Sequence, residues 1–151
     1  MITQSPAQLI HILMVEDDPA DVRLTREALK NKKVHTTMDT VEDGLEAMTY
    51  LHKEGAYAGK QRPDLILLDL NMPRMDGREV LSEIKKDPKL RSIPVIVLTT
   101  SDGEEDILSA YDMNANCYIT KPVDWKQFIR VVELIENFWL TVVKLPKESD
   151  K

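Results

Sequence analysis

Residues 65–77 read LILLDLNMPRMDG, and this stretch decides the predicted fold. Its first four residues are apolar without alternation, which is typical of a strand buried on both faces of a parallel sheet. Asp69 follows that strand directly, and Asp76-Gly77 then precedes a helical pattern that ends at Asp87-Pro88. The stretch therefore predicts a strand–loop–helix unit with a carboxylate at the carboxyl end of the strand.

The same kind of unit lies on both sides of this stretch. Five apolar runs are predicted as strands, at residues 10–15, 34–41, 65–68, 94–98 and 117–119. Helical patterns follow them, beginning after Asp18, Asp43, Asp76, Asp102 and Asp124. The alternation predicts an α/β fold: a doubly wound, five-stranded parallel sheet of order 2-1-3-4-5, with helices on both faces.

Length and composition fit one domain. The 151 residues are 42% hydrophobic, enough for a single core, and we expect a tail at 1–8, a domain at 9–140 and an extension at 141–151. A net charge of −6 argues against general binding to nucleic acids or anionic membranes. The single cysteine permits no internal disulfide, and neither a signal peptide nor an apolar span of ~20 residues is evident, so a cytoplasmic location is predicted.

Polar side chains stand at the carboxyl ends of the predicted strands, where a doubly wound sheet places its site. Glu16 and Asp17 end the first strand, Asp69 the third, Thr99 the fourth, and Lys121 the fifth. Three clustered carboxylates repel one another unless a cation compensates, and Mg²⁺, or Mn²⁺ in its place, suits oxygen ligands. The set predicts a carboxylate nucleophile beside a metal, with a lysine and a hydroxyl to bind a phosphoryl group.

Each of these motifs is weak alone, because acidic turns, Lys-Pro dipeptides and Thr-rich helix caps are common. Their order at successive strand ends is far more specific. Four segments, VEDDPADVR (15–23), LILLDLNMPRMDGREVL (65–81), IPVIVLTTS (93–101) and CYITKP (117–122), resemble the signatures of response-regulator receiver domains. The resemblance covers residues 9–140 and implies a flavodoxin-like fold that acts as a phosphorylation switch.

The resemblance also implies a metal and phosphoryl site. Asp69 would be the phosphoacceptor and a metal ligand. Asp17 would bind Mg²⁺ directly, Glu16 would bind it through water or support Asp17, and the Asn71 main-chain carbonyl would complete the protein ligands. Lys121 would contact the phosphoryl group. Glu16 departs from the aspartate that is usual at this position, which leaves the metal geometry open.

The switch residues are implied in the same way. Thr99 would move its hydroxyl towards the phosphoryl group, and Tyr118 would swing inward with it. Thr100 stands where the family usually has alanine, and its larger side chain narrows access to the site. The Lys121–Pro122 peptide bond would be cis, which costs little before proline.

Three further segments are similar to the small stand-alone response regulators that serve cyanobacterial phytochromes. They are HKEGAYAGKQRPDLILLD (52–69), DLNMPRMDGREVLSEIKKDP (69–88) and IENFWLTVVKLP (135–146). This similarity implies a phytochrome histidine kinase as the phosphoryl donor, and leaves the downstream protein open. The last helix and its apolar extension exceed what a small domain buries, so we expect a homodimer with Phe138, Trp139 and Leu140 as contact candidates.

Other functions fit less well. A phosphatase working through an aspartyl phosphate usually has a second aspartate two residues after the nucleophile, where this chain has Asn71. A transcription factor needs a DNA-binding domain, and none is recognisable after residue 140. The main alternative is a receiver-like module that binds partners without phosphorylation, although the intact acids, Thr99 and Lys121 argue against it.

Overall fold

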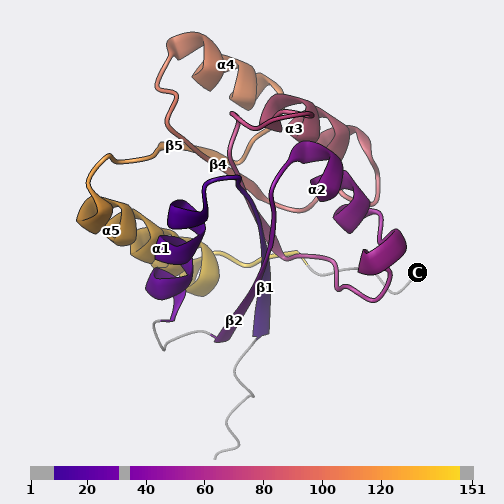
Figure 1. Cartoon of the computed structure of the whole chain (residues 1–151), viewed down its shortest axis with the longest axis horizontal. Helices are drawn as coiled ribbons and strands as arrows, with labels where there is room; N and C mark the ends of the chain where they lie inside the picture. Colours follow the sequence, from indigo (N-terminus) through magenta and orange to yellow (C-terminus); the bar gives the residue numbers. More distant parts are fainter. Residues whose placement is uncertain (1–8, 31–34, 147–151) are drawn as a thin grey trace, which may run out of the picture.

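A computed structural model describes residues 9–30 and 35–146, so the predicted tail at 1–8 and residues 147–151 lie outside it. Within the described residues the chain forms a five-stranded parallel sheet of order β2-β1-β3-β4-β5 (Figure 1). The strands are β1 (Leu9–Val15), β2 (His35–Val41), β3 (Leu65–Leu68), β4 (Val95–Thr99) and β5 (Cys117–Thr120). The predicted fold class and strand order are confirmed.

Helices cover both faces of the sheet, with α1 and α5 on one side and α2, α3 and α4 on the other (Figure 1). They are α1 (Pro19–Leu29), α2 (Gly44–Leu51), α3 (Gly77–Lys86), α4 (Glu104–Asp112) and α5 (Trp125–Ile135), with a short 3-10 helix η1 (Gly55–Tyr57) and a π-helix η2 (Glu136–Val142) that continues α5. Four of them begin at an aspartate whose carboxylate accepts a first-turn backbone N–H: Asp18, Asp43, Asp76 and Asp124. These caps satisfy N–H groups that lack a helical partner.

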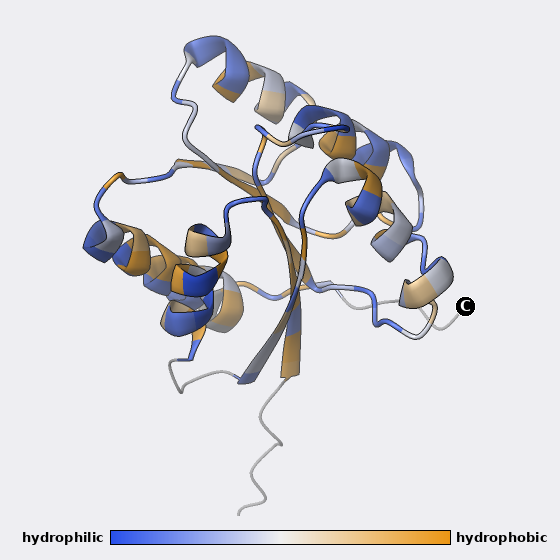
Figure 2. Ribbon diagram, in the orientation of Figure 1, coloured by the Kyte–Doolittle hydropathy of each residue, from blue (hydrophilic) through white to orange (hydrophobic). Residues whose placement is uncertain are grey.

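Alternate residues of each central strand face opposite cores. In β3, Ile66 and Leu68 pack towards α2, α3 and α4, whereas Leu65 and Leu67 pack towards α1 and α5. The orange strands and inner helix faces of Figure 2 follow this pattern. Every residue of β3 and β4 is buried, as expected for strands covered on both faces. The sheet is therefore a fixed platform for the loops at its carboxyl edge.

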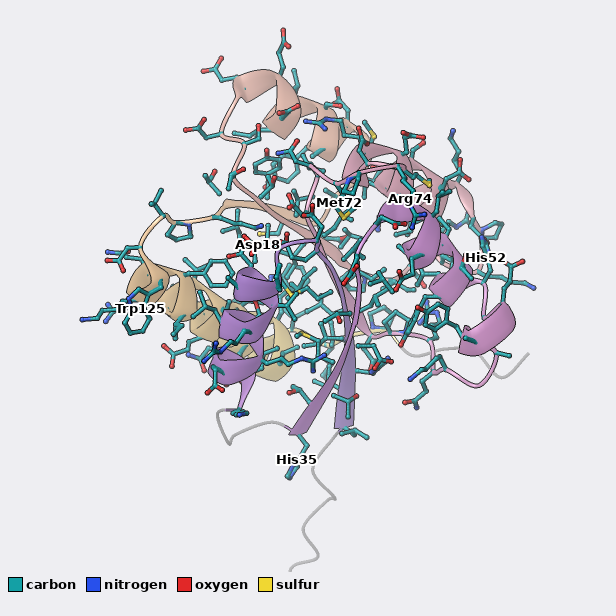
Figure 3. The ribbon with its side chains drawn as sticks, viewed as in Figure 1. Asp18, His35, His52, Met72, Arg74 and Trp125 are labelled. Carbon is teal, nitrogen blue, oxygen red and sulfur yellow. The ribbon has the colours of Figure 1, made fainter. Side chains whose placement is uncertain are left out.

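Several side chains of α5 and η2 are buried or exposed differently from what the sequence predicts. Trp125 points away from the body of the protein (Figure 3) and is 57% exposed, although its helical spacing predicts packing. Of the three predicted dimer contacts, Leu140 is buried in the core beneath α1 and α5, Trp139 packs partly against that core, and Phe138 is exposed. Leu140 is therefore corrected from a surface contact to a core residue, because η2 turns its side chain inward.

None of the described helices is both long enough and apolar enough to span a membrane.

Candidate functional site

Three carboxylates gather at the carboxyl ends of β1 and β3, which are neighbours in the sheet. Glu16, Asp17 and Asp69 each offer an oxygen atom within 4.8 Å of the others. Glu16 and Asp69 are buried, whereas Asp17 is exposed and faces the route from solvent. Clustered carboxylate oxygens are the ligands that Mg²⁺ and Mn²⁺ prefer, so these residues fit a hard divalent cation.

Lys121 crosses from the loop after β5 into this cluster. Its Nζ donates to Glu16 Oε1 at 2.5 Å, to Asp21 Oδ2 at 2.8 Å and to Asp69 Oδ2 at 3.4 Å. The lysine is 7% exposed, so these interactions are shielded from water. Asp21 was missed by the sequence analysis; its place in the first turn of α1, four residues after Asp17, is a signal that could have indicated it.

Burial and charge shift the pKa values within the cluster. Burial raises the pKa of Glu16 to about 8, with a smaller contribution from the Asp69 charge, although Lys121 opposes both. Burial alone would lower the pKa of Lys121, but its hydrogen bonds to Asp21 and Glu16 raise it above the ordinary lysine value. Lys121 is therefore charged at neutral pH. Lys121 contacts three acids, and Asp17 lies within 4.8 Å of two of them, so acidic groups outnumber the one lysine. This excess of acid favours a further cation.

The remaining side-chain contacts of Asp69 come from neighbouring loops and from β4. Thr99 is fully buried and its Oγ1 donates to Asp69 Oδ1 at 2.8 Å. The Asn71 main-chain N–H donates to the same oxygen at 3.2 Å, and Asn71 Nδ2 donates to Thr99 Oγ1 at 3.4 Å. Thr100 is exposed at the rim. The structure thus brings Thr99, Asn71, Lys121 and Glu16 around one carboxylate, as the strand order predicts.

Tyr118 is the second residue of β5, three residues before Lys121, and it contacts the loop after β4. Its hydroxyl donates to the Ser101 main-chain carbonyl at 2.7 Å. The Ser101 hydroxyl donates in turn to Asp106 of α4, and Arg78 Nη2 of α3 donates to Asp106 Oδ1 at 2.6 Å. These contacts join Tyr118 to α3 and α4. Sequence reasoning missed Arg78 and Asp106, since side chains on two different helices pair without any sequence motif.

One predicted feature is wrong. The Lys121–Pro122 peptide bond is trans, and none of the peptide bonds between described residues is cis. The trans form is intrinsically the more stable one for X-Pro bonds by about 0.5–1 kcal/mol. Lys121 reaches Glu16, Asp21 and Asp69 with the trans bond, so these contacts do not require the cis form.

The arrangement combines a partly shielded carboxylate, a hydroxyl donor, a lysine cation and an acidic pocket for a metal. A family model for the response regulator receiver domain matches residues 12–133, which span the sheet, this cluster and most of α5. The chain belongs to the receiver domain family. The resemblance seen in the sequence is therefore confirmed. The matched residues include every charged residue of the cluster.

Similar proteins agree with this assignment. The receiver is 50% identical over 135 residues to the response regulator Rcp1 of Synechocystis, covering 89% of this chain and 92% of Rcp1. The crystal structure of the phosphorylated cyanobacterial phytochrome response regulator RcpA superposes with a TM-score of 0.90 at 54% identity, covering 93% of this chain and 100% of RcpA. The Mn²⁺-bound form of Rcp1 gives a TM-score of 0.89 at 48% identity, covering 91% and 99%.

Proposed function

We propose that this receiver is a phosphorylation-dependent signalling switch in which Asp69 accepts a phosphoryl group with Mg²⁺ beside it. The observation that carries the proposal is the surroundings of Asp69. A hydroxyl donor lies 2.8 Å from one carboxylate oxygen, an ammonium group lies 3.4 Å from the other, and two further acids offer metal ligands within 4.8 Å. The proposal assigns these parts to transfer, charge neutralisation and metal binding.

The transfer requires one bond to form and one to break. An oxygen of Asp69 attacks the phosphorus of a phosphohistidine, the new O–P bond forms, and the P–N bond breaks with its electron pair returning to the imidazole. Lys121 stays protonated and binds a phosphoryl oxygen. Thr99 turns its hydroxyl to another phosphoryl oxygen, and Thr100 restricts access at the rim. The receiver thus assists its own phosphorylation and dephosphorylation without being an enzyme for another substrate.

The metal would be held by Asp17 and Asp69, with Glu16 supporting directly or through water and the Asn71 main-chain carbonyl as a further ligand. When bound, Mg²⁺ offsets the negative charge on phosphoryl oxygens. The acidic excess around Lys121 supports this assignment, because three acids contact the lysine and Asp17 lies beside two of them. The existence of a Mn²⁺-bound form of Rcp1, which is 48% identical over the matched chain, supports binding of a divalent cation.

The switch would pass through Tyr118. The phosphoryl group adds about −1.5 to −2 charges at pH 7, which draws Thr99 and Lys121 towards it. Tyr118 contacts the Ser101 carbonyl in the loop between β4 and α4, so a displacement of Thr99 reaches α4 through this loop. The output is then a changed surface on α4, β5 and α5 for a downstream protein.

The donor would be a histidine kinase, specifically a cyanobacterial phytochrome, acting in the cytoplasm. The similarity to RcpA, a cyanobacterial phytochrome response regulator that is 54% identical, supports this partner. The receiver would form a homodimer through α5 and its extension. The exposed side chains of Leu134 and Phe138, 60% and 54% accessible, lie four residues apart and support a contact there.

The test is a direct measurement of phosphorylation. Full-length protein with acetyl phosphate or a phosphoramidate and Mg²⁺ should gain the mass of one phosphoryl group, in an acid-stable and base-labile linkage. Asp69→Asn or a chelator should abolish the gain, whereas Asp112→Asn, an exposed aspartate on α4, should retain it. Label that persists in Asp69→Asn would move the site, and an unmodified wild type would favour the phosphorylation-independent module.

A further inference from the structure

A buried carboxylate lies outside the acid cluster, at the carboxyl end of the edge strand β2. Asp43 is 4% exposed and caps α2 by accepting the Glu46 N–H at 2.9 Å. Its other oxygen, Oδ2, accepts from Arg74 of the loop between β3 and α3, at 3.0 Å from Nε and also from Nη2. Buried carboxylates require such charged partners, so Arg74 and Asp43 form a specific pair between two loops.

The backbones of the same two loops are also joined. The Gly44 N–H donates to the Met75 main-chain carbonyl at 3.0 Å, and a Cβ at Gly44 would lie 2.1 Å from that oxygen. Only glycine permits so close an approach. Arg74 adopts a positive φ of 65°, a backbone conformation that residues other than glycine rarely take. Contacts with the start of α2 thus hold residues 74–75 in this conformation.

The last residue of β2 also holds the loop after β1, which carries Glu16 and Asp17. The Glu16 N–H donates to the Val41 carbonyl at 3.0 Å, two residues before Asp43. The edge strand supplies no predicted metal ligand, yet its end contacts both loops that carry them. On the β3 side, Asp69 and Asn71 precede Arg74 by five and three residues. Through its contact with Asp43, Arg74 therefore joins the segment that carries Asn71 to the end of β2.

We propose that Arg74 and Asp43 are positioning residues that hold the loop between β3 and α3 in the conformation required for metal binding. The inference rests on the proposed function, in which the Asn71 main-chain carbonyl is a metal ligand. Asn71, Pro73 and Arg74 are exposed, so the apolar packing of this segment comes from Met72, which is buried, and Met75, which packs partly against the core. Without the Arg74–Asp43 pair, the free-energy cost of ordering the loop must be met when the metal binds, so the metal affinity falls.

The positioning role and simple electrostatics predict opposite changes in cation affinity when Arg74 is removed. Removing the positive charge of Arg74 makes the surroundings of the site more negative, which by itself would tighten cation binding. Loss of positioning has the opposite effect. Asp43→Asn keeps a residue that caps α2 well while removing the charge that Arg74 contacts. The double variant Arg74→Ala with Asp43→Asn restores the wild-type net charge but not the pair.

The experiment measures Mn²⁺ affinity by electron paramagnetic resonance on the unphosphorylated full chain. Arg74→Ala should weaken Mn²⁺ binding roughly tenfold, the range seen when residues supporting metal ligands are removed. The double variant should stay weak. Arg62→Ala is the matched control, because it removes the same charge from an arginine whose guanidinium contacts Ser92 instead. A second, metal-free measurement is hydrogen exchange of the Gly44 amide, which should lose protection in Arg74→Ala.

The outcomes separate the two proposals. Wild type that binds no Mn²⁺ overturns both the metal site and the positioning role. Wild type that binds while Arg74→Ala binds equally or more tightly, or a double variant that returns to wild-type affinity, overturns the positioning role alone. An equal loss in Arg62→Ala, or unchanged Gly44 exchange in Arg74→Ala, overturns it as well.

Discussion

The carboxyl edge of the sheet and the outer face of α5 depart from the usual burial pattern in opposite directions. At the carboxyl edge, charged side chains are inside: Glu16 is 2% exposed and Lys121 7%. On α5 and its continuation, large apolar side chains are outside: Leu134 is 60% exposed and Phe138 54%. Most charged residues lie at the surface and large apolar ones inside, so both regions are exceptions.

The difference indicates what each region does. Burying charge is costly unless every charge is paired, so a buried acid–lysine cluster is retained where its charges act on something. Exposed apolar side chains act only when another surface covers them. The first region therefore predicts chemistry with a small charged group, and the second predicts contact with a protein. Substitutions in one region should leave the other property intact.

The largest expected effect is that of Lys121→Met. The variant keeps much of the side-chain volume but loses the cation that Asp69 and Glu16 contact, and we expect phosphorylation by acetyl phosphate to slow roughly 100-fold. Mg²⁺ should raise the melting temperature of this variant more than that of wild type, because the carboxylates then lack their internal cation. Phosphoryl incorporation and thermal unfolding with and without Mg²⁺ measure both effects.

Lys126→Met provides the control for that substitution. Lys126 is exposed on α5, where its ammonium lies over the Trp125 ring, so the chemical change is the same but the location differs. If Lys121→Met is phosphorylated as fast as Lys126→Met, the buried lysine has no special role in phosphorylation and the contrast between the two regions fails.

A smaller, complementary effect is expected for Leu134→Glu. The new charge lies on the exposed face of α5, so it should convert the proposed homodimer to a monomer while leaving phosphorylation within about twofold of wild type. Light scattering after gel filtration gives the mass. Leu108→Glu is the matched control, because Leu108 is 64% exposed on α4. A wild-type mass of one chain at high concentration, or a dimer that survives Leu134→Glu, contradicts this assignment of the α5 surface.

The smallest effect concerns acid sensitivity at Asp43. Burial alone would raise the pKa of this carboxyl, but the Glu46 N–H and the Arg74 guanidinium hold it below its ordinary value. A lowered folded-state pKa contributes stability that is present above the unfolded value, about 3.9, and is lost as the pH falls through the folded value. Asp43→Asn should therefore be less stable than wild type by under about 1 kcal/mol at pH 6.

Urea unfolding at pH 6 and at about pH 3 measures this difference, since the lower value lies below the unfolded pKa. The gap between wild type and Asp43→Asn should shrink on acidification, because the unfolded chain takes up a proton at Asp43 before the folded protein does. A gap that is independent of pH would mean that the charge of Asp43 contributes nothing to the stability of this edge.

The sequence was sufficient for most of the fold and for the acid cluster. Non-alternating runs such as 65–68 indicate strands buried on both faces, and parallel strands gather their carboxyl ends, so Glu16, Asp17 and Asp69 could be placed together. Asp21 and the Arg74–Asp43 pair were missed, because pairing between separate elements depends on side-chain conformations that no local pattern encodes. This accounts for the contacts found only in the structure.

Two further differences have physical causes. Helical spacing from Trp125 to Ile135 predicts a packed face, and it correctly indicates Phe128 and Ile135 as core residues, whereas Trp125 at the start of α5 is exposed. The π-helix η2 has a wider turn than an α-helix, so extending the same periodicity past Ile135 misplaces the faces of the following residues. Leu140 is expected at the surface from the excess of apolar residues in this extension, whereas η2 turns its side chain into the core.

The division of β3 between two cores constrains how the protein can change in length. Leu65 and Leu67 belong to one side and Ile66 and Leu68 to the other, so parity along the strand decides which side each residue serves. Deleting or inserting a single residue within β3 would exchange the two sets of side chains and turn the reactive acid to the wrong side. Length variation among descendants of this chain should therefore fall in the segment between α2 and β3.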